Sequence, residues 1–171
     1  MVRRAGRGGC RRIYWDSCVW LRYVNETPEN KDVLDSLLAD SAYGRGDIEI
    51  VTSLLANTEV AFALHEQTNH ALDDDTEQKI DSLLKDHSAI TVVELYPAIA
   101  LQARGLIRIG IEKGWSLKPY DAIHLATAQR MEVDEFHTYD TRLHRYSNEL
   151  GFPITDPFVH GGPPNPQGQL I

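Results

Sequence analysis

Short apolar runs alternate along the chain with longer segments of helical periodicity. The first run is 13–15, and similar runs lie within 47–53, 89–95 and 135–140. Their β-branched and aromatic residues favour strands. In the intervening segments, apolar side chains recur three and four residues apart, which is typical of helices with a buried face. Strands that alternate with helices in this way predict a mostly parallel sheet covered by helices on both faces.

The same pattern places the helices. We expect them within the segments 19–26, 29–46, 53–66, 73–87, 96–114, 118–131 and 141–151. Ser53 is the expected cap of the third of these helices, and Asp75 or Thr76 is the expected cap of the fourth. The segment 96–114 has apolar residues on more than one face, so this helix is expected to be well buried. A short fifth strand is expected at 153–155.

The length and composition fit a single domain. The chain has 171 residues, of which 42% are hydrophobic, and this is enough for a proper core. We predict a flexible basic leader over 1–11, a folded domain over 12–158 and a Pro/Gly-rich tail over 159–171. No apolar run approaches the length needed to cross a membrane. Cys10 and Cys18 form neither a disulfide framework nor a zinc pattern, so a reducing cytoplasm is the expected location.

Charge is distributed unevenly along the chain. There are 17 Lys and Arg against 25 Asp and Glu, which gives a formal net charge of −8. The first twelve residues contain arginines and no acids, so the remainder is more acidic than the total indicates. Such a body repels nucleic acid on average. Either these acids are solvated surface residues, or some of them converge on a pocket that holds cations, and net charge does not distinguish the two.

Four acids occupy positions that favour the second interpretation. Asp16 and Asp140 each end a predicted strand, and ligands of parallel sheets bind at the carboxyl ends of the strands. Glu59 and Asp121 lie in otherwise apolar helices, where an unpaired charge is costly. Each acid alone has a simpler explanation, since Asp16, Asp121 and Asp140 can cap helices and Glu59 can pair with a basic residue. Four such acids in one α/β layer are harder to explain by capping and pairing.

Two histidines lie close to these acids in the sequence. His124 follows Asp121 by three residues on the same helix face, and His137 precedes Asp140 by three. We interpret both as buried, hydrogen-bonded histidines rather than catalysts. No G-x-S-x-G nucleophile elbow and no Gly-rich phosphate loop of either standard type occurs in the chain.

Four segments together resemble the motifs of PIN domains, most closely those of VapC-type toxin ribonucleases: YWDSCVWLRYV, TSLLANTEVAFA, YDAIHLATAQRM and FHTYDTRLHR. The resemblance covers residues 12–158. It implies a three-layer α/β/α sandwich with a central, mostly parallel sheet of about five strands. The segment that contains Glu59 is the least specific of the four. Glu49 and Glu66 are nearby competitors, but Glu59 best matches the family phrase.

The resemblance also implies a site and an activity. Its metal-binding acidic set is Asp16, Glu59, Asp121 and Asp140, which would hold Mg²⁺ or Mn²⁺ for the hydrolysis of RNA phosphodiester bonds. Ser17 and Thr138 match the hydroxyl residues that hold carboxylates or bound water. From their positions near the acids, Lys118, Arg142 and Arg145 are candidates for binding phosphate, although exposed basic residues are more often only solvated.

The implied partners are an RNA substrate, a small cognate antitoxin protein and a second copy of the chain in a homodimer. The helices over 19–24 and 32–40 would form the groove for the antitoxin. Trp20 and Tyr23 are possible apolar anchors there, though core packing is the commoner use of either. An inactive PIN-like module that binds RNA or protein, and a housekeeping PIN nuclease outside any toxin–antitoxin pair, remain alternatives.

Two other α/β enzymes with an acid at a strand end are disfavoured. A haloacid-dehalogenase-type phosphatase needs a second Asp two residues after the first, and that position is Cys18. A response regulator needs an acidic pair before its phosphorylated Asp, and the sequence before Asp16 offers none.

Overall fold

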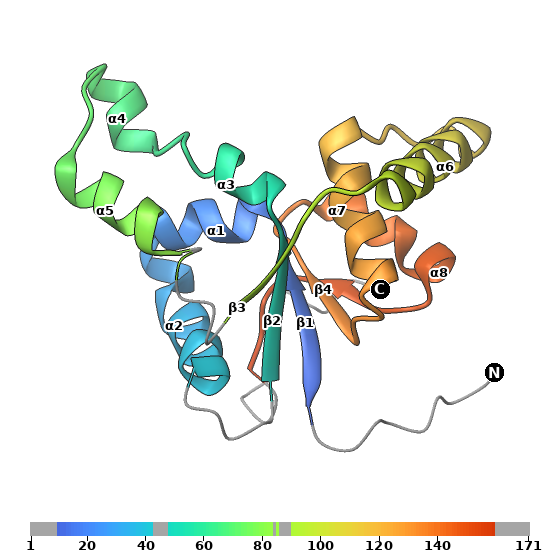
Figure 1. Ribbon diagram of the computed structural model, residues 1–171, viewed down its shortest axis with the longest axis horizontal. Coiled ribbons are helices and arrows are strands. Elements are labelled where there is room, and N and C mark those ends of the chain that lie inside the picture. The colour runs from blue at the N-terminus through green and yellow to red at the C-terminus, as the bar shows by residue number, and fades with distance from the viewer. Residues whose placement is uncertain (1–9, 43–47, 84, 86–89, 160–171) are drawn as a thin grey trace.

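The computed structural model describes residues 10–42, 48–83, 85 and 90–159. Its centre is a parallel sheet in the order β3-β2-β1-β4-β5 (Figure 1). The strands are β1 (Arg11–Trp15), β2 (Ile48–Ser53), β3 (Ile90–Val93), β4 (Glu135–His137) and β5 (Ile154–Thr155). Ile13 on the central strand is in register with Ile50 of β2 and with Glu135 of β4.

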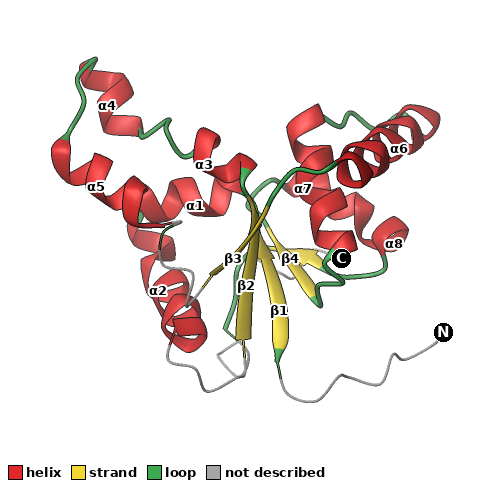
Figure 2. Cartoon of the chain, in the orientation of Figure 1, coloured by secondary structure: helices red, strands yellow, loops and turns green. Residues whose placement is uncertain are grey.

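Helices cover both faces of the sheet (Figures 1 and 2). One side carries α1 (Ser17–Val24), α2 (Pro28–Ala42), α3 (Leu55–Glu59), α4 (Leu64–Asn69) and α5 (Asp74–Leu83). The other side carries α6 (Pro97–Lys113), α7 (Pro119–Arg130) and α8 (Ser147–Leu150), the last of which follows a 3₁₀ helix, η1 (Thr141–Tyr146). The structure confirms the predicted α/β/α sandwich with a parallel sheet of five strands.

The central strand divides the core into two parts. Tyr14 packs into the cluster that includes α6 and α7 and stacks on Phe136 of β4 at 4.9 Å between ring centroids. Ile13 and Trp15 pack into the cluster on the α1 and α2 side. This alternation follows from the period of two of a strand. Because all three side chains are fully buried, the residue that follows β1 has a firmly held backbone.

The prediction of a single helix over 53–66 is wrong, because the segment contains α3 and the start of α4, with a turn between them. Tertiary hydrogen bonds explain the break. Asn25 accepts a hydrogen bond from the backbone N–H of Leu64 at 2.9 Å, and Gln67 donates to the carbonyl of Phe62. The backbone of Ala63 is extended immediately before α4. A residue of another helix therefore fixes the start of α4, which local periodicity does not reveal.

Two smaller expectations are also corrected. The cap at the start of α5 is Asp73 rather than Asp75 or Thr76, because its carboxylate accepts hydrogen bonds from both the backbone N–H and the hydroxyl of Thr76. The helix α6 is buried on one face only, since Leu101 and Ile111 are largely exposed.

Some expectations concern residues that the structure does not describe. Most of the predicted leader and tail lies in 1–9 and 160–171, outside the described residues. Within the described residues, the helices are too short or too polar to span a membrane.

Gly110 provides a test of the packing between α6 and the segment after β4. A Cβ at this position would lie 2.5 Å from the hydroxyl of Tyr146 and 2.9 Å from the carbonyl of Trp115. We expect Gly110→Ala to destabilise the protein by about 1–2 kcal/mol, because overpacking outweighs the gain in helix propensity. Urea unfolding measures the change.

A matched glycine in the same helix is the control. A Cβ on Gly105 would meet no atom within 4 Å, so Gly105→Ala should stabilise the protein by about 0.5–1 kcal/mol. The Tyr146 hydroxyl has no hydrogen-bond partner among the described residues. Tyr146→Phe should therefore restore part of the stability lost in Gly110→Ala. If Gly110→Ala costs the same stability with Tyr146 as with Phe at that position, the proposed clash is wrong.

Candidate functional site

Asp16 lies at the carboxyl end of the central strand and caps α1. Its Oδ1 accepts hydrogen bonds from the backbone N–H groups of Cys18 at 3.1 Å and Val19 at 3.3 Å. The side chain is almost fully buried. Burial raises the pKa of Asp16, and this effect is only partly offset by nearby His124 and by hydrogen bonds. Asp16 therefore caps α1 and is at the same time a buried carboxylate at the end of β1.

Cys18 links Asp16 to the segment after β4. Its thiol donates to Asp16 Oδ1 at 2.8 Å, contacts the Thr138 hydroxyl at 3.2 Å and accepts from the backbone N–H of Tyr139. Burial and the Asp16 charge raise the pKa of the thiol, so Cys18 is a neutral hydrogen-bond donor to Asp16. The sequence carries no signal for this role, because a cysteine two residues after an Asp forms no distinctive motif.

Thr138 lies between Asp16 and Asp140. Its hydroxyl accepts a hydrogen bond from the backbone N–H of Asp140 at 3.0 Å and also helps to hold down the pKa of Asp16. Ser17, the other predicted hydroxyl residue, has no side-chain hydrogen bond within the described part of the chain. Only Thr138 thus has contacts in this structure that match the predicted supporting role.

Asp121 and Asp140 face the same region. Asp121 lies in the first turn of α7, and its pKa is raised by burial and then by the charges of Asp140 and Asp16. Asp140 follows β4, and both of its oxygens accept hydrogen bonds from the guanidinium of Arg142. This pairing lowers the pKa of Asp140. Three of the four predicted acids are therefore close enough to affect one another's ionisation.

Glu59 joins this group through His124. It ends α3, and its Oε2 lies 2.7 Å from Nε2 of His124, whose Nδ1 lies 2.8 Å from the hydroxyl of Tyr14. His124 also lowers the pKa of both Asp16 and Asp121, which places its ring among the acids. The interpretation of His124 as a buried, hydrogen-bonded histidine is correct. The sequence does not indicate that Glu59 is its partner.

The competing glutamates lie elsewhere. Glu49 binds Arg12 and Thr91 near the start of β2, at the opposite end of the sheet. Glu66 accepts from the backbone N–H of Asp73 between α4 and α5. His137, the second histidine near the acids, is fully buried and pairs with Glu135 on the same strand. Among the described residues, none of these three side chains is hydrogen-bonded to the four acids, and His137 contacts Asp16 only through its backbone carbonyl, which accepts from the Asp16 N–H at 3.5 Å.

The four acids suit a hard divalent cation in chemistry, though not in their present arrangement. Carboxylate oxygens are the ligands that Mg²⁺ and Mn²⁺ prefer. The pKa of Asp121 is raised first by burial and then by the charges of Asp140 and Asp16, and a cation would neutralise that negative charge. Among the described residues, however, no three His, Cys, Asp or Glu side chains are arranged to hold a metal ion. Glu59 is engaged by His124 and Asp140 by Arg142. A cation bound by Asp140 would therefore compete with Arg142 for the same carboxylate.

The three predicted phosphate-binding residues separate into two groups. Arg142 pairs with Asp140, and the charge of Lys118 also lowers the pKa of Asp140. Both are therefore close to the acids. Arg145 instead lies over the ring of Trp115, just beyond the end of α6. The structure thus brings Lys118 and Arg142, but not Arg145, into the neighbourhood of Asp140.

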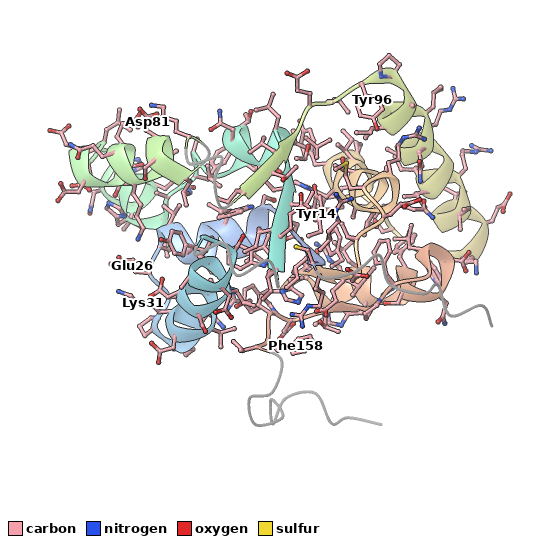
Figure 3. All side chains as sticks on the ribbon, turned by 60° about the horizontal axis from the view of Figure 1, so that its bottom comes forward. Tyr14, Glu26, Lys31, Asp81, Tyr96 and Phe158 are labelled. Atoms are coloured by element: carbon pink, nitrogen blue, oxygen red, sulfur yellow. The ribbon has the colours of Figure 1, made fainter. Side chains whose placement is uncertain are left out.

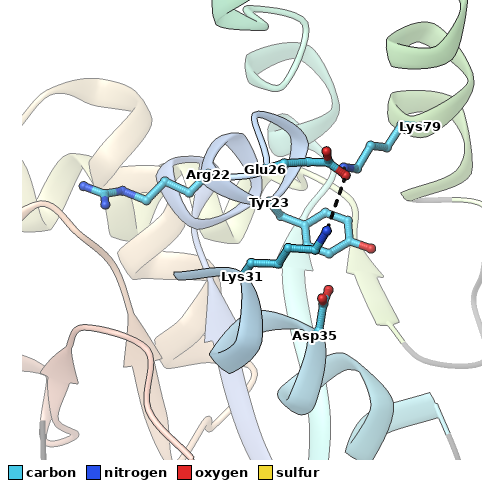
Figure 4. A pocket seen from close by; sticks show the side chains of 6 residues that line it. All are labelled: Arg22, Tyr23, Glu26, Lys31, Asp35 and Lys79. Carbon is cyan, nitrogen blue, oxygen red and sulfur yellow. Dashed lines mark hydrogen bonds and ion pairs between the residues drawn. The ribbon is translucent and has the colours of Figure 1, made fainter. Parts of the chain in front are cut away.

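The two residues predicted to anchor a partner differ in how deeply they are buried. Trp20 is fully buried and donates to the Thr52 hydroxyl at 3.0 Å, so it belongs to the core. Tyr23 lines a pocket of about 250 Å³ between α1, α2 and α5 (Figure 4). Charged residues surround the tyrosine ring there, and Glu26 pairs with both Lys31 and Lys79. Of the two candidates, only Tyr23 is available to a partner.

Comparison with known families identifies the class of protein. The model of the PIN domain family matches residues 13–149, which is most of the chain. The protein therefore belongs to the PIN domain family. No curated protein matches the chain by sequence.

Several solved structures share its fold. VapC20 from Mycobacterium tuberculosis, described as a sarcin–ricin loop cleaving toxin, is 15% identical and superposes with a TM-score of 0.60, covering 88% of this chain and 99% of that one. VapBC2 from Rickettsia felis, solved with a DNA fragment from its promoter, is 13% identical with a TM-score of 0.62, covering 86% and 99%. FitAcB from Neisseria gonorrhoeae is 13% identical with a TM-score of 0.54, covering 85% and 97%. At these identities the likeness is one of fold.

Proposed function

We propose that the protein is a metal-dependent endoribonuclease and the toxin of a type II toxin–antitoxin pair. The observation that carries this proposal is the electrostatic coupling of Asp16, Asp121 and Asp140 at the carboxyl ends of the strands, in a chain of the PIN family. Such clustering of perturbed carboxylates is characteristic of functional sites. The similarity in fold to a toxin that cleaves the sarcin–ricin loop supports RNA as the substrate.

Each side chain has a distinct task in this proposal. Asp16, Glu59, Asp121 and Asp140 would hold Mg²⁺ or Mn²⁺, which would supply activation of water and neutralisation of charge on the phosphate. Arg142 exchanges Asp140 for the RNA phosphate, a ligand that a guanidinium binds well. Lys118 adds positive charge beside the same group, and Thr138 keeps Asp16 and Asp140 in place through its hydroxyl.

The proposed partners follow from the fold relatives. Two of the solved structures with this fold are VapBC assemblies, from Rickettsia felis and Haemophilus influenzae. We infer that a small antitoxin protein binds this chain and that the toxin acts in the cytoplasm as a homodimer. The pocket between α1, α2 and α5, which the half-buried Tyr23 lines, is a point of contact for such a partner.

One observation favours a second candidate function. In the structure, Glu59 and Asp140 are each paired with a cationic or hydrogen-bonding side chain. An inactive PIN-like module that binds RNA or protein needs no open acidic site and would keep these pairs permanently. The two functions differ in whether divalent ions bind and RNA is cut.

A cleavage assay distinguishes these functions. The purified full chain is incubated with end-labelled total RNA in Mg²⁺, Mn²⁺ or EDTA. Discrete fragments that form only with a divalent ion support the nuclease, whereas RNA binding without cleavage supports the inactive module. Cleavage unaffected by EDTA would exclude the metal mechanism. Growth arrest on expression, relieved by a small protein encoded next to the gene, separates a toxin from a housekeeping nuclease.

Arg142 should act as an internal competitor of the metal. Arg142→Gln removes the guanidinium from Asp140, so we expect the Mn²⁺ concentration for half-maximal cleavage to fall by about two- to fivefold, the range of an exposed ion pair. The KM for RNA should rise because a phosphate contact is lost. Titrating Mn²⁺ at fixed RNA, and RNA at saturating Mn²⁺, measures both. Arg145→Gln is the matched control, and a higher Mn²⁺ requirement in Arg142→Gln would contradict the competition.

A further inference from the structure

A buried hydrogen-bonded chain connects the core of the protein to Glu59. The chain runs from the Tyr14 hydroxyl to Nδ1 of His124, and from Nε2 of His124 to Oε2 of Glu59. Tyr14 is 0% exposed and His124 is 1% exposed, so solvent reaches neither group. Three separate elements, β1, α7 and α3, therefore meet in one line of hydrogen bonds.

The chemistry of Glu59 fixes the direction of one of these bonds. An ionised carboxylate only accepts hydrogen bonds, so Nε2–H of His124 donates to Glu59. The Tyr14 hydroxyl can donate or accept, and it holds the Nδ1 edge of the same ring. Tyr14 is itself packed by its stacking on Phe136. The imidazole ring is therefore held at both nitrogens, with its Nε2 edge toward Glu59.

Glu59 has less local restraint than Asp16 and Asp140 have. Asp16 is held by two backbone N–H groups and a thiol, and Asp140 by the backbone N–H of Arg142. Glu59 is the last residue of α3, a helix of five residues, and a helix this short has little stability of its own. Among the described residues, His124 is the hydrogen-bond partner of its carboxylate.

We propose that His124 is a positioning residue that holds Glu59 for metal binding, with Tyr14 holding the far edge of the imidazole ring. The histidine occupies Oε2 and leaves Oε1 of Glu59 for the cation or for water bound to it. His124 itself contacts neither metal nor RNA. The inference rests on the proposed function, since it assigns a role within the same acidic site. Partners of this kind affect metal affinity by about 10- to 100-fold in other metal sites.

Two amide variants separate positioning from simple packing. Gln at position 124 places an amide near Nε2, where it still donates to Glu59, whereas Asn reaches only as far as Nδ1 and Tyr14. Each variant keeps one hydrogen bond of the chain and loses the other, so both should lower the melting temperature. Metal affinity should differ, because only His124→Gln retains the contact with Glu59.

The measurement is Mn²⁺ binding to the metal-free full chain, by calorimetry or by the EPR signal of free Mn²⁺. We expect His124→Asn to raise the Kd for Mn²⁺ by about tenfold and His124→Gln by less than about threefold. In the Glu59→Gln background the two variants should bind Mn²⁺ equally. Their kcat at saturating Mn²⁺ should recover more fully than their activity at low Mn²⁺.

The outcomes separate this inference from the proposed function. If the wild-type chain binds Mn²⁺ and His124→Asn and His124→Gln have the same Kd, His124 is a packing residue and the positioning role is wrong. If the wild-type chain neither binds Mn²⁺ nor cleaves RNA, the proposed function fails and the role of His124 fails with it. If His124→Asn and His124→Gln still differ in their Kd for Mn²⁺ in the Glu59→Gln background, the positioning role is also wrong.

Discussion

Asp16→Asn is expected to reduce RNA cleavage on the order of a thousandfold, the loss seen when one major electrostatic group leaves an active site. The substitution removes the charge but keeps an oxygen in the same place. Asn caps helices as well as Asp does, so the hydrogen bonds from Cys18 and Val19 to Oδ1 can persist. The activity should therefore fall without loss of the fold.

Single-turnover cleavage of a labelled RNA at saturating Mn²⁺ measures this loss. Asp81→Asn is the matched control, because Asp81 is an exposed acid on α5, far from Tyr14 and the carboxyl ends of the strands (Figure 3). Asp16→Ala adds the loss of the cap, which should cost about 1 kcal/mol of stability. Wild-type cleavage by Asp16→Asn would show that Asp16 serves only as a cap.

The sequence was sufficient to place Asp16 and Asp140. Asp16 follows a strongly apolar strand and Asp140 follows the buried β4, and in a parallel sheet the carboxyl ends of strands meet at one edge. The same reasoning could not divide residues 53–66 into two helices, because the cap of α4 is Asn25, which lies 39 positions earlier. Local patterns predict elements, whereas their ends depend on partners brought in by the tertiary structure.

The contacts within the site were harder to predict for the same reason. His124 and Glu59 are 65 residues apart, and Tyr14 and His124 are 110 residues apart. The sequence identified each residue as buried or acidic but contained no signal for their pairing. In the sequence, Cys18 belongs to no disulfide or zinc pattern and argues against a phosphatase, whereas the structure shows it donating to Asp16. Side-chain partners of this kind emerge only when the elements are packed together.

The ionisation of the acids predicts how the metal-free protein responds to pH. Burial raises the pKa of Asp16 and Asp121, and neighbouring acids raise that of Asp121 further. A carboxyl group with a raised pKa in the folded state favours folding below its unfolded pKa, and this contribution is lost as pH rises through the folded pKa. The contribution of Asp140 to stability has the opposite pH dependence, because Arg142 lowers the pKa of Asp140. It is present above the unfolded pKa and is lost as pH falls through the folded pKa. At neutral pH, the burial of Asp16 and Asp121 therefore costs the metal-free fold stability.

Mn²⁺ should therefore raise the melting temperature substantially at neutral pH. At a free Mn²⁺ concentration about 100 times Kd, mass action contributes about 2.7 kcal/mol, which corresponds to about 5–10 °C for a chain of this size. Differential scanning fluorimetry with Mn²⁺ and with EDTA measures the shift. The shift should shrink as pH falls, because protonated carboxyl groups do not bind the ion.

Asp16→Asn makes this test stricter, because its expected effects on the melting temperature without metal and on the Mn²⁺ shift have opposite signs. Without metal, the variant should melt at a higher temperature than the wild-type chain, since a buried charge has been removed while the cap remains. With Mn²⁺, it should gain much less than the wild type, because a ligand is missing. Asp81→Asn should show neither effect. Two results would contradict this prediction: a metal-free melting temperature of Asp16→Asn below that of the wild type, or a full Mn²⁺ shift in this variant. Either would mean that Asp16 is retained for stability, and that it does not lower stability in order to bind metal.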